Sequence, residues 1–237
     1  MAQSARKHAA TRFRSAIARS NALHAAYLDD AALFASYDRF TRWQVDYLLP
    51  FFHDLLEPEG HAEAAEFIVS DLAGVGVGER DRDIERATPV IVRTLPVHPL
   101  ETAAAAVELN AAALEINTAI WRALLIDEEL PAEISEHAYR SACRVVSSYE
   151  QCMDLADLAN ELGETLKTLA HMPLMGALLR TMRLPAHATG FGALHRFLET
   201  GYLTFHRIAD IDRFLDEVGR RLSEVFRYIY LEPLPRV

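Results

Sequence analysis

Four of the charged residues in the segment 79–86 form a candidate cluster: Arg80, Asp81, Asp83 and Arg86. On a helix, Asp83 lies about one turn from both arginines, so that it can pair with either. An arginine of such a cluster can also bind a carboxylate or phosphate ligand through two parallel N–H donors. The four residues are therefore a candidate ligand site. The alternative, which is more common, is a structural network of ion pairs at the start of a helix.

A second pattern is a repeat of glutamates every seven residues at Glu101, Glu108 and Glu115. This spacing places the carboxylates along one side of a helix, where they could contribute to a metal site in a bundle core. Di-iron carboxylate bundles also use a Glu-x-x-His element, and the sequence contains none. Glu108 and Glu115 are thus candidate metal ligands, with a solvated stripe or paired core acids as the alternative.

Histidines supply the remaining metal candidates. His195 is followed four residues later by Glu199, and His206 by Asp210, which places each pair on one helix face. Gly201 could fold two helical ends together and gather His195, Glu199 and His206. A haem is also open to consideration, but the sequence has no Cys-x-x-Cys-His attachment motif. The identity of any cofactor stays undefined.

These residues must be positioned by helices, because helical periodicity runs through almost the whole chain and alternating strand patterns are absent. The sequence predicts helices at 4–27, 30–49, 61–72, 80–94, 100–126, 131–146, 147–170, 172–182, 192–199 and 208–230. Pro185 should break the chain after the eighth of these. Short connections favour an all-α fold, in which residues 1–237 form a single compact multi-helix domain with an antiparallel helix bundle core.

Composition excludes several classes of protein. The chain has 237 residues, of which 51% are hydrophobic and 24% charged, as in ordinary globular proteins. Two cysteines, Cys143 and Cys152, are too few for a disulfide framework and suit a reduced, cytoplasmic protein. A net charge of −10 disfavours nucleic acid as a partner. No apolar run reaches the ~18–20 residues of a transmembrane helix.

The charge is uneven, because residues 1–28 carry five basic residues and no acid. This basic amphipathic segment could be a transit peptide, an arm for an anionic surface, or a helix packed on the acidic body. Phe13, Ile17 and Leu23 would give the packed helix a face to bury, which favours the third interpretation.

Several short motifs follow one another in a recognisable order between residues 40 and 230. Residues 67–74 (FIVSDLAG) follow Trp43-Gln44 and precede Arg80-Asp81, and residues 183–186 (RLPA) precede 197–202 (FLETGY). This order resembles a family of bacterial helical proteins of unknown function, named for its FFLEELY signature. Ser70-Asp71 here stands in place of the signature's acidic pair, and Ala73 in place of its tyrosine. The resemblance implies a bacterial helical protein, but it assigns no activity and no catalytic residues.

Two classes of function remain. The first, which the absence of catalytic motifs favours, is a non-enzymatic module that binds a partner protein or a small-molecule ligand between its helices. The alternative is a metal- or haem-dependent helical-bundle oxidoreductase with carboxylate and histidine ligands, which rests on architecture alone. A homo-oligomer is compatible with either class.

Overall fold

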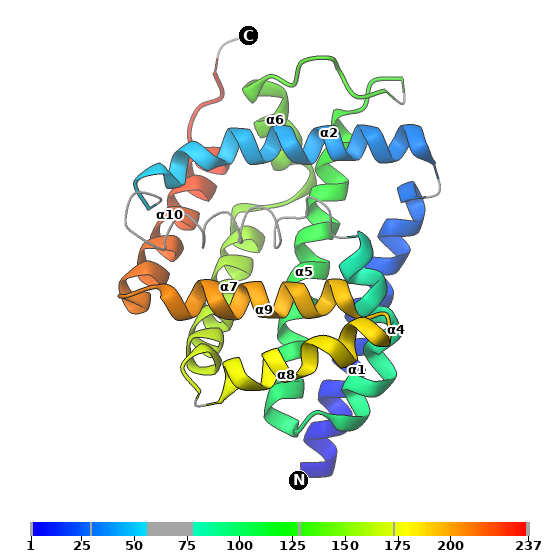
Figure 1. Ribbon diagram of the computed structural model, residues 1–237. Coiled ribbons are helices and arrows are strands. Elements are labelled where there is room, and N and C mark those ends of the chain that lie inside the picture. Colours follow the sequence, from blue (N-terminus) through cyan, green and yellow to red (C-terminus); the bar gives the residue numbers. More distant parts are fainter. Residues whose placement is uncertain (1, 29, 56–77, 128, 173, 236–237) are drawn as a thin grey trace.

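The computed structural model describes residues 2–28, 30–55, 78–127, 129–172 and 174–235. Within these ranges it contains nine α-helices, one 3-10 helix and no strand, which confirms the all-α prediction (Figure 1). A predicted helix at 61–72 lies outside the described residues. The elements are α1 (Ala2–Leu28), α2 (Ala31–Leu48), η1 (Leu49–Leu55), α4 (Gly78–Thr94), α5 (Val97–Leu124), α6 (Glu136–Val146), α7 (Tyr149–Ala170), α8 (Met175–Ala188), α9 (Gly192–Arg207) and α10 (Ile211–Leu231).

Several helices begin at side chains that satisfy the free N–H groups of the first turn. Asp30, Ser135 and Asp210 cap α2, α6 and α10. α7 begins with a capping box, in which Ser148 and Gln151 each accept a hydrogen bond from the other's backbone N–H. Such caps are worth about 1 kcal/mol each, so the sequence itself fixes where these helices start.

The longest pair of neighbouring helices, α1 and α5, runs in parallel. Arg12 of α1 lies beside Glu108 of α5, and Arg19 lies beside Glu115, so residue numbers rise in the same direction on both helices. Alanines at the contact, among them Ala9 and Ala104, allow close packing around Phe13 and Leu100. The long excursion of the chain between α1 and α5 makes this parallel arrangement topologically accessible.

Other helices pair in the antiparallel sense that the sequence predicted for the bundle core. α7 and α10 run antiparallel, with Lys167 beside Asp212 at one end and Cys152 beside Tyr230 at the other. The bundle is therefore mixed, because an antiparallel α7–α10 pair stands next to the parallel α1–α5 pair. The aromatic core lies mainly between α2, α5, α6 and α10, and it includes Trp121 and Tyr139.

α8 and α9 form an antiparallel hairpin at the edge of the molecule opposite to α2 and α6 (Figure 1). Two expectations from the sequence are wrong here. Pro185 lies inside α8 and does not break it, since α8 continues to Ala188. Gly201 lies inside α9 and does not divide it, because Thr204 and Phe205 beyond it are buried and hold the helix against the core.

Candidate functional site

The charged cluster of α4 connects this helix to the start of α9. Asp83 is buried, and one of its carboxylate oxygens accepts hydrogen bonds from the backbone N–H groups of Ala193 and Leu194, at 3.0 and 3.1 Å. Phe191, at the N-cap position of α9, provides no side-chain cap. Asp83 therefore caps α9 from a distant helix, which combines a capping hydrogen bond with a favourable negative charge at the helix N-terminus.

Arg86 completes this connection. Its guanidinium donates to Asp83 and to the carbonyl of Gly190 at 2.6 Å, and it lies 5.8 Å from the ring centre of Phe191. Gly190 has a φ of +79°, which a residue without a Cβ adopts readily. Burial alone would raise the pKa of Asp83, but the hydrogen bonds from Leu194, Arg86 and Ala193 outweigh it and the pKa is lowered. The Asp83–Arg86 pair thus holds the α8–α9 hairpin.

The other two members of the candidate ligand site, Arg80 and Asp81, lie in α4, but their side chains are outside the described part of the structure. The acceptor atoms of Asp83 are occupied by the protein itself. A ligand role for the cluster as a whole stays a prediction.

The glutamate repeat of α5 meets an arginine repeat of the same period on α1. Arg12 donates to both carboxylate oxygens of Glu108, with Nε at 2.9 and 3.1 Å, and Arg19 lies 3.6 Å from Glu115. The pKa of Arg12 is raised, chiefly by its hydrogen bond to Glu108. Both glutamates thus pair with basic residues of α1 while their side chains stay 30 and 42% exposed, and a metal role for them stays a prediction.

The three candidate residues in α9 also contact neighbouring parts of the protein. His195 is buried, its Nε2 lies 2.8 Å from the carbonyl of Leu179 in α8, and its Nδ1 lies 3.9 Å from Glu199. Glu199 pairs with Arg183 of α8 at 2.5 Å, and its pKa is lowered chiefly by this hydrogen bond. His206 lies 3.1 Å from the carbonyl of Ala170, at the end of α7.

The candidate metal ligands do not form one site. Glu108 and Glu115 lie at the α1–α5 contact, whereas His195 and Glu199 lie in the α8–α9 hairpin. Among the residues that the structure describes, no three histidine, cysteine, aspartate or glutamate side chains are grouped to hold a metal ion. The metal assignment stays a prediction.

The contacts of Asp83, His195 and Glu199 share one effect, which is to hold α8 and α9 in place while one face of α8 remains in solvent. None of the residues of α8 is buried. Leu174, Leu178 and Met182, four residues apart, are 80, 56 and 47% exposed, and Leu184 is 81% exposed. This exposed apolar surface of residues 174–184 is named the α8 face below.

The segment that carries the α8 face contains more basic than acidic residues. Residues 171–207 contain four arginines and a single acid, Glu199, although the whole chain has a net charge of −10. Three of the five methionines, Met172, Met175 and Met182, also lie in this segment. Methionine adapts its shape to different partners and is common at binding surfaces. The hairpin therefore differs in both charge and exposed apolar area from the rest of the protein.

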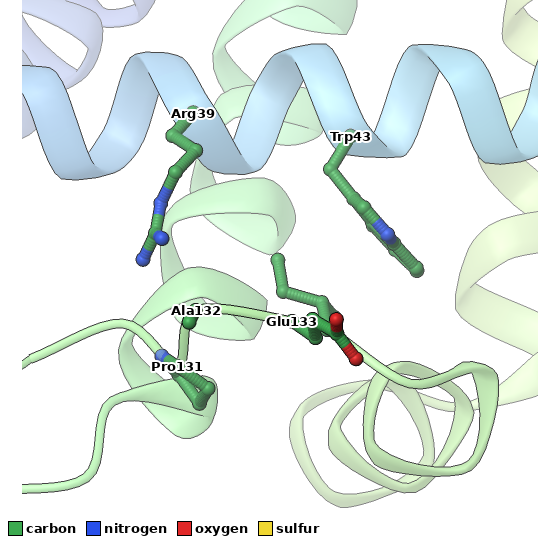
Figure 2. Close-up of a pocket in the computed structure, with 6 residues that line it drawn as sticks. Arg39, Trp43, Pro131, Ala132 and Glu133 are labelled. Atoms are coloured by element: carbon green, nitrogen blue, oxygen red, sulfur yellow. The ribbon is translucent and has the colours of Figure 1, made fainter.

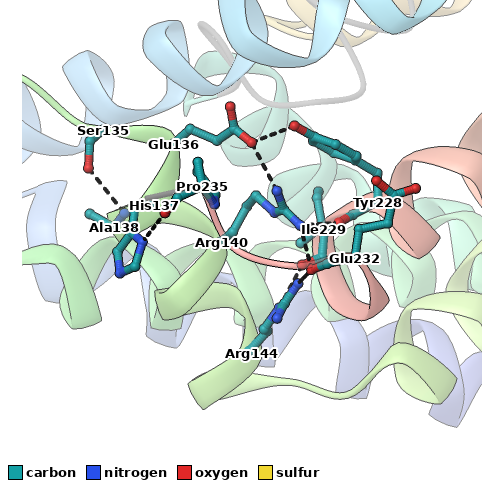
Figure 3. A network of polar contacts seen from close by, with 10 residues as sticks. All are labelled: Ser135, Glu136, His137, Ala138, Arg140, Arg144, Tyr228, Ile229, Glu232 and Pro235. Carbon is teal, nitrogen blue, oxygen red and sulfur yellow. Dashed lines mark hydrogen bonds and ion pairs between the residues drawn. The ribbon is translucent and has the colours of Figure 1, made fainter. Parts of the chain in front are cut away.

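Sequence reasoning did not foresee the most buried charge in the described residues. Arg140 of α6 is 2% exposed, and it donates to the carbonyls of Tyr228 and Glu232 at 2.6 and 2.8 Å (Figure 3). It also pairs with Glu136 at 3.0 Å, and its guanidinium lies 4.2 Å from the ring centre of Tyr228. Arg144, one turn later, donates to the carbonyls of Ile229 and Glu232.

Together, Arg140 and Arg144 cap the C-terminus of α10, whose last carbonyls have no partner within the helix. The signal in the sequence is a pair of arginines four residues apart on one side of a short amphipathic helix, combined with a helix end that carries no glycine. This arrangement stabilises the end of α10 through the terminal nitrogens of Arg140 and through Arg144, while the buried Nε of Arg140 has no hydrogen-bond partner among the described residues.

Comparison with known families adds one assignment. A model of a domain of unknown function, DUF8198, matches residues 23–233. The chain belongs to this family. No curated protein and no solved structure matches the chain. The family has no described function, and the match does not test the resemblance to the FFLEELY family, whose signature-like residues 67–74 lie outside the described structure.

The length and apolar character of the helices bear on whether one of them could span a membrane. Within the part of the chain that the structure describes, none of the helices combines the length and the apolar character that crossing a bilayer requires.

Proposed function

We propose that this chain is a non-enzymatic protein-interaction module and that the α8 face is its docking surface. The observation that carries the proposal is that α8 buries none of its residues while it presents leucine and methionine side chains to solvent. Complete burial of one leucine is worth about 1.5–3 kcal/mol, so three exposed leucines leave several kcal/mol available to a partner. Exposed apolar patches of this kind typically mark interaction sites.

The way α8 is attached supports this interpretation. Polar contacts fix its inner side to α9: the carbonyl of Leu179 is hydrogen-bonded to His195, and Arg183 forms an ion pair with Glu199. These contacts orient the helix so that Leu178 and Met182 point away from the hairpin core. Leu174 also adopts a left-handed conformation with φ +71° while it is 80% exposed, and a bulky residue tolerates this conformation only at a cost.

Charge favours an acidic amphipathic helix as the partner. Such a helix would place apolar residues spaced i, i+3, i+4 and i+7 against the α8 face and carboxylates beside the arginines of the hairpin. Arg196 is exposed and has no acidic partner among the described residues, so it is available for this role. An anionic bilayer is less suitable, because its broad surface would also meet the acidic remainder of the chain.

The metal- or haem-dependent oxidoreductase remains the untested alternative. The contacts of Glu108, Glu115, His195 and Glu199 within the described structure are all with other protein groups. No specific observation therefore favours that alternative over the interaction module.

Two synthetic helical peptides test the proposal. Both carry the same leucine face, but glutamates flank it in one and lysines in the other. Fluorescence anisotropy should detect binding of the glutamate peptide and about tenfold weaker binding of the lysine peptide, a difference near 1.4 kcal/mol. Binding of the glutamate peptide should weaken with added salt, since screening reduces the attraction between exposed charges.

Substitutions locate the site. Leu178→Glu should weaken binding of the glutamate peptide at least as much as the change of peptide does, because it puts a charge into the apolar stripe. Val145→Glu is the matched control, since Val145 is an exposed apolar residue of α6, outside the hairpin. Equal binding of both peptides, binding that Leu178→Glu leaves unchanged, or preferential binding to phosphatidylserine vesicles would overturn the proposal.

A further inference from the structure

A surface cavity of about 340 Å³, open to solvent on one side, lies between α2 and the segment that leads into α6 (Figure 2). Arg39 and Trp43 line it from α2, and residues 131–134 (Pro-Ala-Glu-Ile) line it from the other side. Ligand pockets in proteins typically measure about 300–1,000 Å³. The cavity is thus at the lower limit of that range and has room for a small molecule only.

Other aromatic side chains fix the orientation of Trp43. Its ring stacks on Tyr47, with the ring centres 5.2 Å apart and the planes 8° from parallel. Tyr139, which is buried, meets Trp43 edge-to-face at 5.1 Å. Because Trp43 is held in this way and is only partly buried, it offers the cavity a preformed apolar wall that needs no ordering when a ligand binds.

Arg39 and Glu133 bring opposite charges to the same cavity without pairing with each other. Arg39 lies one helical turn before Trp43, and its guanidinium donates to the carbonyl of Leu130. That single hydrogen bond anchors the side chain and leaves other N–H donors available. Figure 2 shows the guanidinium of Arg39 and the carboxylate of Glu133 on different sides of the space below Trp43.

We propose that this cavity binds a small zwitterion, namely a free α-amino acid with an apolar side chain. Arg39 would hold the ligand carboxylate, because a guanidinium matches a carboxylate with two parallel donors. Glu133 would accept hydrogen bonds from the ligand ammonium group. The apolar side chain would pack on the indole of Trp43. The separated charges of Arg39 and Glu133 are each satisfied by this class of ligand, whereas a simple acid or a simple amine satisfies only one of them.

Three probes of matched shape test the proposal: L-leucine, 4-methylpentanoate without the ammonium group, and 3-methylbutylamine without the carboxylate. Isothermal titration calorimetry on the unaltered chain measures their affinities at concentrations up to about 10 mM, which covers weak small-molecule binding. Leucine should bind at least about tenfold more tightly than either analogue, since each analogue leaves one charge without its partner.

Tryptophan fluorescence provides a local readout. The chain contains two tryptophans, and Trp121 is buried in the core beside Ser36. In a Trp121→Phe variant, leucine should change the emission of Trp43 with the same affinity that calorimetry gives. Calorimetry keeps the proposal testable if this variant does not fold.

Charge removal separates the two halves of the site. Arg39→Gln should weaken the binding of leucine and of 4-methylpentanoate but leave the binding of 3-methylbutylamine unchanged. Glu133→Gln should weaken the binding of leucine and of 3-methylbutylamine but leave the binding of 4-methylpentanoate unchanged. Arg42→Gln is the control, because Arg42 is in the same helix and pairs with Asp38 instead of lining the cavity. Absence of saturable leucine binding, or an analogue that binds as tightly as leucine, would overturn the proposal. Since this cavity does not include the α8 face, its test is independent of the peptide experiment.

Discussion

The carboxylate of Asp83 in α4 accepts a hydrogen bond of 3.1 Å from the backbone N–H of Leu194, which lies 111 residues later at the start of α9. Asp83 therefore does for α9 what a local serine or aspartate does for other helices. This one residue couples the position of α4 to that of the α8–α9 hairpin, and hence to the α8 face.

Removing the distant cap should loosen the hairpin. Asp83→Ala should reduce the free energy of unfolding by about 1–2 kcal/mol, the upper range for a cap, and should increase hydrogen exchange at the first turn of α9. Asp83→Asn should reduce the free energy of unfolding by less, because an amide oxygen can still accept hydrogen bonds from the backbone N–H groups of Ala193 and Leu194. Glu85→Ala, an exposed change in the same helix, is the control. Equal losses for the Ala and Asn variants would contradict the capping role.

Acid should destabilise the protein through its hydrogen-bonded carboxylates. The pKa of Asp83 is lowered in the folded protein, and so is the pKa of Glu136, chiefly by a hydrogen bond from Tyr228. A lowered folded pKa means that the stabilisation is complete above the unfolded values, near 4, and is lost as the pH falls through the folded values. Urea unfolding between pH 6 and about pH 3 should show this loss, and it should be smaller in Asp83→Ala.

The ion pairs between α1 and α5 should stabilise the folded protein. A double-mutant cycle of Arg12→Gln and Glu108→Gln should give a coupling energy of about 0.5–1 kcal/mol, because the bidentate pair is only partly buried. The same cycle on Arg42 and Asp38, an exposed pair within α2, should give no measurable coupling. If Glu108 instead binds a metal, Glu108→Gln together with Glu115→Gln should lower the metal content of the purified protein.

The two arginines that cap α10 should differ in importance. Arg140→Met should reduce the free energy of unfolding by about 3 kcal/mol, because it removes the buried guanidinium that pairs with Glu136 and donates to the carbonyls of Tyr228 and Glu232. Arg144→Met should cost about 1 kcal/mol, since Arg144 is more exposed. Urea titrations of both variants measure the difference, and similar losses would show that burial of Arg140 is not decisive.

Both thiols should be unreactive in the folded protein. Cys143 and Cys152 are free and buried, and burial raises the pKa of Cys143 to about 12 and also raises that of Cys152. A thiol reagent such as Ellman's should therefore modify them in urea but hardly at all in native buffer at pH 8, because the thiolate is the reactive form. Rapid modification of the native protein would contradict this placement.

Local signals in the sequence predicted the helices well, because caps and apolar periodicity act over a few residues. α7, for example, begins at Tyr149, close to the predicted start at 147, whereas α6 begins at Glu136 after the Ser135 cap and not at Pro131 as the sequence predicted. Pro185 and Gly201 misled the prediction, since both lie inside helices despite their local preference. The buried Thr204 and Phe205 hold α9 together beyond Gly201.

The partners of the charged residues were beyond the reach of the sequence. The seven-residue spacing of Glu108 and Glu115 is visible in the sequence, and so is that of Arg12 and Arg19. Nothing local indicates that these two arginines are the partners of those two glutamates. The contact of Asp83 with Leu194 likewise depends on the path of the whole chain between them. The exposure of the α8 face could not be predicted either, because its pattern of leucines is also that of an ordinary buried helix.

The parallel packing of α1 on α5 has a consequence during synthesis on the ribosome. Glu108 is made 96 residues after Arg12, which at cellular elongation rates is a delay of roughly 5–20 s. Throughout that interval Phe13 and its alanine neighbours have no α5 to cover them. Native packing of this first helix therefore has to wait for a much later part of the chain.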